Sequence, residues 1–305
     1  MTMQQILYAL TIAQCGSMNR AAQKMYVTQP SLTSTIQDLE EELNIKIFNR
    51  TAKGVSVTAE GADFLAGARH LYQQYEMLVE NYSDAGRIKR KFGVSTQHYS
   101  FVVKAFVNTV KKFDTSEFEF AILETRTRDV ISDVANAKSE IGVLFINEYN
   151  KKIIDRMLHS HDLEFTALIS CKAFVYMWKG NPLAGKKKVS LKQLADYPCL
   201  YFDQGDESSL FFAEEILSDY EYARSIKTND RATMLNLMMG LNAYTLCSGI
   251  IASDINGDDF VAVPFEEDKE NKNGSMTVGY ITNRKARLSE VGEIFVKELK
   301  HSLNL

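Results

Sequence analysis

The chain has 305 residues, of which 45% are hydrophobic and 24% are charged, and its formal net charge is −4 at pH 7. This length allows two or three domains of ordinary size, and the composition excludes a disordered or fibrous protein. An apolar run at residues 6–13 has no basic leader and is too short to span a bilayer, and no later run reaches about eighteen apolar residues. We therefore expect a cytoplasmic protein that makes no membrane contact.

Residues 17–43 show the first strong pattern, which predicts two short helices separated by a tight turn. The apolar positions recur at helical spacing, at Ala21, Ala22 and Met25 in the first helix and at Leu32, Ile36, Leu39 and Leu43 in the second. The break falls at residues 26–28, where Thr28 is a suitable N-cap. Pro30 then occupies the first turn of the second helix, where its missing N–H costs little.

The solvent face of the second helix carries short hydrogen-bonding side chains, namely Gln29, Ser31, Thr33, Ser34 and Gln37. Such a face suits a helix that lies in the major groove of DNA, because Gln pairs bidentately with adenine and Ser or Thr adapts to several bases. The alternative is an ordinary helical pair with a polar exterior.

A hairpin wing is predicted after the second helix. A short apolar piece at residues 45–48 precedes Arg50 and Lys53, and a strand-like alternation follows at residues 55–57. Cations at the tip of such a hairpin contact phosphates and fix the position of the protein on DNA without reading the sequence. Helix, turn, helix and wing together predict a winged helix-turn-helix domain over residues 1–58.

The run AAQKMYVTQPSLTSTIQDLEEELNIKIFNR, followed by TAKGVSVTAEG, resembles the DNA-binding domain of the LysR-type transcriptional regulators. The likeness includes the double alanine, the Gln-Pro-Ser opening of the recognition helix, the Leu-Glu-Glu-Glu-Leu exit, the Phe-x-Arg and the Thr-x-x-Gly that begins the next helix. The chain departs from the family in having Thr33, Ser34 and Thr35 where many members carry a basic residue. The predicted DNA contacts are Ser17, Arg20, Thr28, Gln29, Pro30, Ser31, Thr33, Ser34, Arg50 and Lys53.

A long helix is predicted from residue 59 to about residue 86, with Thr58 as its cap. Its apolar positions step by four and three residues, as in a heptad seam: Phe64, Ala68, Leu71, Tyr75, Leu78 and Tyr82. A seam of this length usually pairs with a second copy, although a helix packed on its own domain is the alternative. In the resembled family this segment is the linker helix of an antiparallel dimer. We therefore assign residues 59–90 to a dimerisation helix and a hinge, with the basic cluster at residues 87–91 as a solvated linker or a contact to flanking phosphate.

A dimer would also compensate for the low charge of the DNA-binding region, because the charges within residues 1–60 sum to zero. Without a broad basic surface, tight binding requires contacts from two copies. The prediction is a homodimer or homotetramer on an interrupted palindrome in double-stranded DNA.

From residue 92 onward strands and helices alternate, which implies parallel sheets with crossover helices. Strands are predicted at residues 92–94, 118–123, 141–146, 174–178, 199–202 and 278–281, and helices at 101–113, 130–137, 210–217 and 233–241. The pieces FGV (92–94), SEIG (139–142) and KGNPL (179–183) resemble the family's effector domain, which has an α/β fold of two Rossmann-like subdomains similar to periplasmic binding proteins. The resemblance implies an effector domain at 91–305, with subdomain I at about 91–161 and 265–305 and subdomain II at about 162–264.

In such a fold a ligand lies where strand ends face helix N-termini, because unpaired N–H groups and the helix dipole favour an anion or a polar group there. Ser95, Thr96 and Gln97 follow the first strand and are the best-placed candidates. By resemblance the other walls carry Thr125, Arg126, Phe145, Phe202, Asp203 and Thr245. A local cap or turn is the alternative for each of them. Arg126 with Ser95 and Thr96 favours an anionic effector.

Enzyme chemistry is not indicated, because the sequence has no GxSxG, P-loop, HExxH or GxGxxG motif, and His159 with His161 lacks a third metal ligand. The prediction is a LysR-type regulator without catalytic residues, metal or cofactor, whose partners are DNA, a small-molecule effector and RNA polymerase. Two alternatives stay open. One is a solute-binding module whose helices serve only dimerisation, and the other is a redox-switched regulator that uses Cys199 and Cys247. Buried free thiols are the simpler interpretation of the four cysteines.

Overall fold

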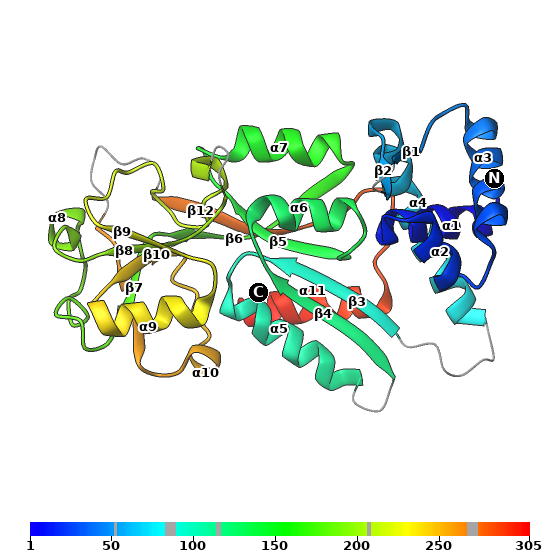
Figure 1. The fold of residues 1–305 in the computed structure, drawn as a ribbon. Coiled ribbons are helices and arrows are strands. Elements are labelled where there is room, and N and C mark those ends of the chain that lie inside the picture. Colours follow the sequence, from blue (N-terminus) through cyan, green and yellow to red (C-terminus); the bar gives the residue numbers. More distant parts are fainter. Residues whose placement is uncertain (52–53, 83–89, 114–116, 206–208, 267–273) are drawn as a thin grey trace. The chain divides into compact units, whose positions relative to one another are not determined.

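The computed structural model describes residues 1–51, 54–82, 90–113, 117–205, 209–266 and 274–305 (Figure 1). The chain divides into two compact units, Met1–Ile88 and Lys89–Leu305. Each unit has a hydrophobic core of its own. Within the described ranges, no helix combines the length and the apolar content that a bilayer crossing requires.

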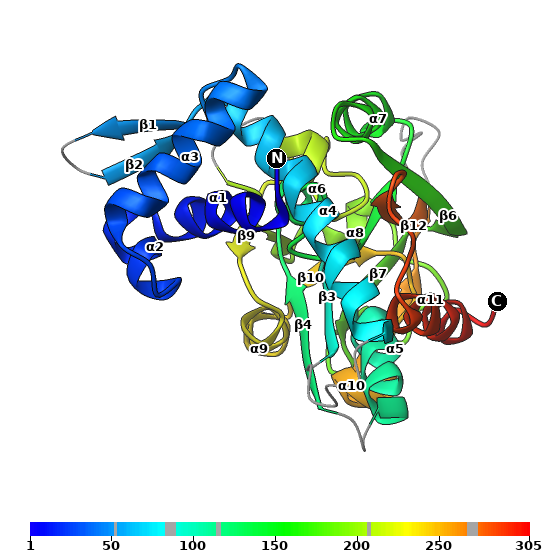
Figure 2. The same ribbon diagram turned by 90° about the vertical axis from the view of Figure 1, so that its right-hand side faces the viewer.

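The first unit is a helical domain with a two-stranded wing (Figure 2). Its elements are α1 (Met3–Cys15), α2 (Met18–Lys24), α3 (Gln29–Leu43), β1 (Phe48–Thr51), β2 (Gly54–Val57) and α4 (Ala59–Tyr82). The apolar stripes of α2 and α3 face inward, where Ala21 and Leu32 are fully buried together with Ile12 of α1. Thr28 caps α3, because its hydroxyl accepts a hydrogen bond from the amide of Ser31 at 3.4 Å.

A buried carboxylate connects α3 to the wing. Oε1 of Glu40 accepts hydrogen bonds from the amides of Ile47 at 2.8 Å and Phe48 at 3.0 Å. Nζ of Lys46 donates to Oε2 at 3.1 Å. Burial opposes ionisation, but these donors outweigh it and lower the pKa of Glu40. The amide of Val55 in β2 also donates to a carbonyl in the turn between α1 and α2, so the wing is held from two sides.

Helix α4 begins in close contact with the segment before the wing and then exposes an apolar face. A Cβ atom on Gly61 would lie 2.2 Å from a backbone carbonyl oxygen of that segment, so only glycine fits there. Further along, Leu71, Tyr75 and Leu78 of the predicted seam are 42%, 41% and 57% exposed. The side chain of Tyr82, the last seam position, lies outside the described residues. Within a single chain, the seam is therefore open to solvent at these three positions, whereas Ala68 is buried and Phe64 is half-buried against the core of the first unit.

The second unit contains two five-stranded mixed sheets, one in each subdomain. The first sheet has the order β4 (Phe118–Glu124), β3 (Arg90–Thr96), β5 (Ile141–Ile146), β12 (Ser275–Asn283) and β6 (Leu163–Lys172). One face is covered by α6 (Thr127–Ala135) and α7 (Lys151–Ser160), and the other by α5 (Ser100–Val110), the 3-10 turn η1 (Lys111–Phe113) and α11 (Glu290–Ser302) (Figure 1). Because β5 is covered on both faces, all of its residues are buried.

The second sheet has the order β11 (Phe260–Pro264), β7 (Phe174–Trp178), β10 (Tyr244–Cys247), β8 (Cys199–Phe202) and β9 (Ser225–Thr228). Strand β10 is parallel to β8 and antiparallel to β7. Helix α9 (Arg231–Leu241) covers one face, where Met234 and Met238 pack against Leu200. The remaining elements are short: α8 (Leu191–Leu194), η2 (Ser209–Phe212) and α10 (Ser253–Asn256).

The chain passes between the subdomains at two segments that lie side by side. The amide of Ala173 donates to the carbonyl of Gly274 at 2.8 Å, and the amide of Phe265 donates to the carbonyl of Ala173 at 3.1 Å. The first crossing is thus at Ala173 and not near residue 162, because residues 163–172 form β6 at the edge of the first sheet.

The structure differs from the sequence prediction at three further points. Both sheets are mixed and not purely parallel. The predicted helix at residues 210–217 is only the 3-10 turn η2, because the consecutive residues Glu214 and Glu215 are both drawn inward to different partners. Arg90 does not belong to a solvated linker, since it begins β3 and its guanidinium donates to Glu290 at 2.9 Å.

Candidate functional site

The outward face of α3 carries most of the side chains predicted to contact DNA. Its exposed members are Thr28, Pro30, Ser31 and Ser34. Gln29 and Thr33 are half-buried, and Nε2 of Gln29 donates to the hydroxyl of Thr33 at 2.7 Å, which orients the amide along the helix. The first turn of α3 contains no acidic residue. The positive end of the helix dipole is therefore not neutralised from within that turn, which suits a helix that approaches a phosphate backbone.

The remaining predicted DNA contacts flank α3. Ser17 caps α2 by accepting a hydrogen bond from the amide of Arg20 at 3.4 Å. The guanidinium of Arg20 donates to the carbonyl of Cys15, so it is held beside the start of α2. The side chain of Arg50, at the end of β1, and the whole of Lys53 lie outside the described residues.

The structure adds a residue that sequence reasoning missed. Tyr26, in the turn between α2 and α3, is 96% exposed and has a φ of 53°. A tyrosine outside the core offers a ring and a hydroxyl to a partner, and the phosphate backbone is the partner that a helix-turn-helix turn approaches. The sequence places Tyr26 between the apolar stripes of two helices, which could have indicated an exposed turn residue. Helical spacing, however, predicts burial or exposure only for residues within a helix.

The polar residues at the end of β3 are buried, and two of their hydroxyls are bonded within the protein. Ser95, Thr96 and Gln97 are completely buried. The hydroxyl of Ser95 donates to Oδ2 of Asp133 at 2.7 Å, and that of Thr96 donates to the carbonyl of Gln97 at 2.8 Å. These side chains fix the end of the strand against α6, so the local interpretation describes them better than direct ligand binding.

Gln97 and Phe145 are also part of the packed interior. Nε2 of Gln97 donates to the hydroxyl of Thr127, and Oε1 accepts from the hydroxyl of Tyr99 at 2.9 Å. The same oxygen accepts from the amide of Phe145 at 3.0 Å, and the ring of Phe145 lies in the core. Thr125 makes a local contact with a carboxylate of α6 at 3.4 Å. These contacts hold the side chains of Gln97, Phe145 and Thr125 within the first subdomain.

Arg126 and Asp203, in contrast, meet across the two subdomains. Nη2 of Arg126 donates to Oδ2 of Asp203 at 2.7 Å, and Nε donates to the carbonyl of Asp203 at 3.2 Å. Beside them the amide of Thr127 donates to Oε1 of Gln204 at 3.0 Å. The ion pair is about half exposed, so its contribution to stability is small. A ligand that binds Arg126 must compete with Asp203.

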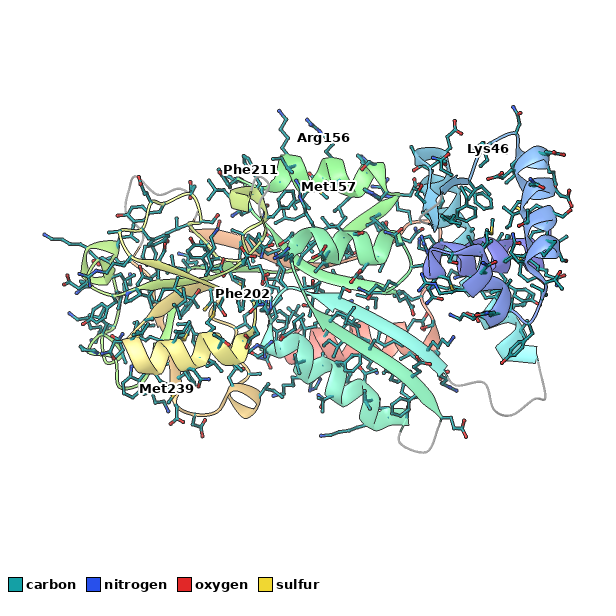
Figure 3. All side chains as sticks on the ribbon, viewed as in Figure 1. Lys46, Arg156, Met157, Phe202, Phe211 and Met239 are labelled. Atoms are coloured by element: carbon teal, nitrogen blue, oxygen red, sulfur yellow. The ribbon has the colours of Figure 1, made fainter. Side chains whose placement is uncertain are left out.

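His98 and Glu214 form a second connection between the subdomains, and sequence reasoning missed both. The amide of His98 donates to Oε2 of Glu214 at 2.8 Å, and Nδ1 of the ring lies 2.9 Å from the same oxygen. The imidazole stacks on Phe202, with ring centroids 3.7 Å apart. Phe202 lies at the boundary of the subdomains (Figure 3). Nε2 of Gln204 donates to the other oxygen of Glu214 at 2.8 Å. No local pattern joins residues that are 116 positions apart.

A cavity of about 80 Å³ lies beside these contacts and is bounded by both subdomains. Thr245, predicted to bind the effector, lines it together with Tyr99, Glu215 and Arg231. The hydroxyl of Thr245 and Oε2 of Glu215 are buried and have no hydrogen-bond partner among the described residues. Arg231, by comparison, pairs with Glu124 across the subdomains. Because buried oxygen atoms without partners are costly, the cavity is a candidate site for a ligand that donates hydrogen bonds.

The cysteines do not form the proposed redox pair. Cys199 lies opposite Tyr244 in the ladder of β8 and β10, whereas Cys247 is at the far end of β10, roughly 10 Å further along the strand. A disulfide requires Cα atoms within about 7 Å of each other. Burial also raises the pKa of both thiols, that of Cys247 to about 12, which keeps them protonated. The redox interpretation is therefore wrong for Cys199 and Cys247.

His159 and His161 lie at the end of α7. Nδ1 of His161 lies 2.8 Å from the carbonyl of Met157, at the exposed end of α7. In the part of the chain that the structure describes, no group of three or more His, Cys, Asp and Glu side chains is arranged to hold a metal ion.

Comparison with known proteins connects these surfaces to a family. Residues 3–62 match the family described as bacterial regulatory helix-turn-helix protein, lysR family, and residues 115–304 match the LysR substrate binding domain. YbhD of Escherichia coli, an HTH-type transcriptional regulator, is 23% identical over 291 residues, which cover 93% of this chain and 86% of YbhD. TfdT of Cupriavidus pinatubonensis, another HTH-type transcriptional regulator, is 45% identical over 71 residues, which cover 23% of this chain and 31% of TfdT.

Solved structures show the same fold along the whole chain. Full-length OxyR from Pseudomonas aeruginosa matches with a TM-score of 0.65 at 16% identity, covering 100% of this chain and 95% of OxyR. Full-length CbnR in complex with its target DNA matches with a TM-score of 0.55 at 16% identity, covering 99% of this chain and 100% of CbnR. The matched families are regulators and not enzymes, which also removes the solute-binding module as a description of the whole chain. The chain belongs to the LysR family of DNA-binding transcriptional regulators, with an N-terminal winged helix-turn-helix and a C-terminal substrate-binding domain.

Proposed function

We propose that this regulator binds an interrupted palindrome with α3 in the major groove and the wing tip on the phosphate backbone. The support is the outward face of α3, where Ser31 and Ser34 are exposed beside the half-buried Gln29. Short polar side chains of this kind read base edges, whereas Arg50 and Lys53 supply contacts that do not depend on sequence. A cytoplasmic location follows from the DNA partner, and RNA polymerase at the promoter is the protein partner in the same proposal.

The binding species is a homodimer formed along α4, alone or paired into a homotetramer. Leu71, Tyr75 and Leu78 lie on one face of α4 and are exposed in the single chain. An apolar face that extends over several helical turns is stable in water when a second copy covers it. The second copy also doubles the phosphate contacts, which matters because the charges of residues 1–60 sum to zero. Light scattering on the purified protein distinguishes dimer from tetramer.

The effector occupies the cavity beside Thr245 and Glu215. The observation that carries this assignment is the pair of buried oxygen atoms without partners, in a cavity bounded by both subdomains. The contacts of Arg126 with Asp203 and of His98 with Glu214 close the same boundary. A ligand that binds the closed arrangement more tightly shifts the population toward it, whereas one that binds both arrangements equally shifts nothing.

The chemistry of the cavity favours a polar effector with hydrogen-bond donors over the anionic effector suggested by the sequence. The hydroxyls of Ser95 and Thr96 are bonded internally, and the guanidinium of Arg126 faces Asp203. The oxygen atoms that remain without partners in the cavity are the carboxyl oxygen of Glu215 and the hydroxyl of Thr245, which can accept as well as donate. A hydroxyl or amide group on the effector satisfies both.

Genome-wide footprinting on fragmented host DNA near physiological salt tests the DNA-binding part of the proposal. The purified protein is expected to enrich a palindrome beside a few genes, and Ser34→Ala is expected to change the preferred bases at one position of each half-site. Lys300→Ala, at an exposed position of α11 in the other unit, is the control that leaves the enriched sequence unchanged. A folded dimer that enriches no site would contradict the proposal.

Calorimetry with metabolites of the pathway encoded beside those sites tests the effector part. Thr245→Val removes a hydroxyl that has no protein partner, so stability is expected to stay within about 0.5 kcal/mol of the parent. Effector affinity is expected to fall by about tenfold, since the lost bond is replaced by a methyl group. Thr277→Val makes the same chemical change on β12, at a residue that does not line this cavity although the adjacent Met276 does, and should leave binding intact. Equal effector affinity in the two variants would remove Thr245 from the site.

A further inference from the structure

The second subdomain contains another cavity, larger than the one at the boundary. Its volume is about 250 Å³, and it lies between strands β8 and β9 and the segment at residues 210–222. Ala213, Ser218 and Tyr220 line it and do not reach the effector cavity, so it is a separate site. We propose that it binds a second ligand, a small amine that carries an aromatic or similarly apolar group.

Aromatic rings form much of the wall. They are contributed by Tyr201, Phe202, Tyr220 and Tyr222. Nζ of Lys227 already lies 5.9 Å from the ring centroid of Tyr201, which shows that a cation is accommodated against this wall. Ring faces attract ammonium groups electrostatically and also pack against an apolar body.

One oxygen of a buried carboxyl group in the wall has no partner. Glu215 is 7% exposed; Oε1 accepts from the amide of Phe202 at 2.9 Å, whereas Oε2 has no hydrogen-bond partner among the described residues. Burial raises the pKa of Glu215 well above its ordinary value, and the adjacent Glu214 adds to the shift. An ammonium group at Oε2 both satisfies the oxygen and balances the charge that burial opposes.

The charges around the cavity exclude an anion. Among the described lining residues the acids are Glu215 and Glu221, and the one cation is Lys227. Lys227 and Glu221 are both exposed, so they stand at the surface and largely balance each other. The interior is left with the carboxyl group of Glu215 and, among the described lining residues, no cation to hold an anionic ligand, whereas a carboxylate–ammonium pair can form there.

This site is physically joined to the effector cavity. Phe202, Glu215 and Leu246 line both cavities. Phe202 also stacks on His98, whose partner Glu214 precedes Glu215 in the chain. A ligand that takes up Oε2 of Glu215 therefore removes one of the two acceptors that the effector site offers. The amine is expected to lower effector affinity, and by linkage the effector lowers amine affinity by the same factor.

Calorimetry on the full-length protein with three probes of one shape tests the ligand class. We use 2-phenylethylamine as the cation, 2-phenylethanol as its neutral counterpart and phenylacetate as the anion. The amine is expected to bind about tenfold more tightly than the alcohol, and phenylacetate is expected to show no saturable binding. Equal binding of the amine and the acid, or no saturable binding of the amine, would overturn the proposal.

Substitutions in the two cavities show which of them binds the amine. Glu215→Gln keeps the shape of the side chain and is expected to weaken the amine by about tenfold or more while leaving the alcohol within about threefold. Ala213→Leu fills the cavity and is expected to abolish binding of both probes. Thr245→Val alters only the effector cavity and should leave the amine unaffected. If Thr245→Val abolishes amine binding and Ala213→Leu does not, the amine is an effector of the boundary cavity and the second site is wrong.

A measurement on the protein without substitutions does not depend on whether the variants fold. With labelled alanine and isoleucine methyl groups, titration of the amine is expected to shift the signals of Ala213 and Ile216, which line this cavity. Ile250 and Ile251 line only the effector cavity and serve as internal controls. Shifts confined to Ile250 and Ile251 would contradict the second site. The test does not use DNA, so its failure is distinct from failure of the proposed regulatory function.

Discussion

The two units of this regulator place their polar side chains in opposite ways. In the first unit the exposed polar residues of α3, such as Ser31 and Ser34, lie on the side away from a small core, and the hydroxyl of Thr28 caps the helix by accepting from the amide of Ser31. In the second unit the polar residues near strand ends bond to distant segments, as His98 does to Glu214. A surface that contacts DNA follows from one amphipathic helix, whereas a cleft between subdomains needs contacts that only folding brings together.

The difference shows which functional residues a pattern identifies. Helical spacing separated the inward positions of α3, such as Leu32, from the outward ones, such as Ser34. The same kind of reasoning placed Ser95 and Thr96 at a strand end but did not show that Asp133 and Ser139 would surround the hydroxyl of Ser95. Being at the correct end of a strand does not determine whether a side chain faces the cleft or the core.

The largest expected effect is on stability, and it tests whether the first unit depends on the buried contact between α3 and the wing. Glu40→Ala removes the acceptor of the Ile47 and Phe48 amides and the partner of Lys46, and it is expected to cost about 3 kcal/mol of unfolding free energy. Chemical denaturation measures it. Glu41→Ala, at the next and exposed position, should change stability by less than about 0.5 kcal/mol. Similar losses of unfolding free energy in the two variants would mean that helix propensity, and not the buried contact, accounts for the effect of Glu40→Ala.

Acid titration gives an independent measure of the same contact. Because the folded-state pKa of Glu40 is lowered, its stabilising contribution is present at neutral pH and is lost as the pH falls through that lowered pKa. Unfolding of the first unit below about pH 4 should therefore become less steep in Glu40→Gln. An unchanged acid profile would assign the acid sensitivity to other carboxylates.

Substitution of two glycines in α4 separates the effect of close packing from that of helix propensity within one helix. A Cβ atom on Gly61 would overlap a backbone carbonyl, whereas one on Gly67 would meet no atom within 4 Å. Gly61→Ala is expected to destabilise the protein by about 2 kcal/mol, and Gly67→Ala to stabilise it by about 0.5 to 1 kcal/mol. Opposite shifts of the thermal midpoint are the expected result, and shifts of the same sign would contradict the packing at Gly61.

Base reading and phosphate contact are separated by two variants of the DNA-binding unit. Gln29→Ala is expected to relax discrimination by roughly 1 to 3 kcal/mol at one base pair, because a bidentate contact is lost. Arg50→Ala should weaken all sequences alike and lower the salt slope by about one. Lys300→Ala removes a cation from the other unit and is the control. Uniform effects of both Gln29→Ala and Arg50→Ala would remove α3 from the role of recognition helix.

The smallest expected effect concerns the ion pair that joins the subdomains. Arg126→Gln or Asp203→Asn is expected to cost less than about 1 kcal/mol, because the pair is partly exposed. A double-mutant cycle measures the coupling directly, with the exposed surface pair Lys285 and Asp162 as the reference. A coupling well above the reference would show that this contact, and not the cavity, sets the closure of the subdomains.

The sequence by itself determined the elements whose patterns depend on neighbouring residues. The stripes of α2 and α3, the Thr28 cap, the wing hairpin and the buried strand β5 all follow from spacing within about ten residues. The family resemblance rests on the same dense stretch. The helix predicted at residues 210–217 failed because consecutive glutamates face inward to partners that the local pattern does not contain.

Tertiary structure alone decided the subdomain boundary and the contents of the cleft. Strand β6 lies at a sheet edge, where burial is mixed, so residues 163–172 carry no clear strand pattern and the crossing moves to Ala173. The partners of His98 and Arg126 come from segments far along the chain. A hydrogen bond depends on distance in space, and between two subdomains with separate sheets that distance is set only when both sheets have formed.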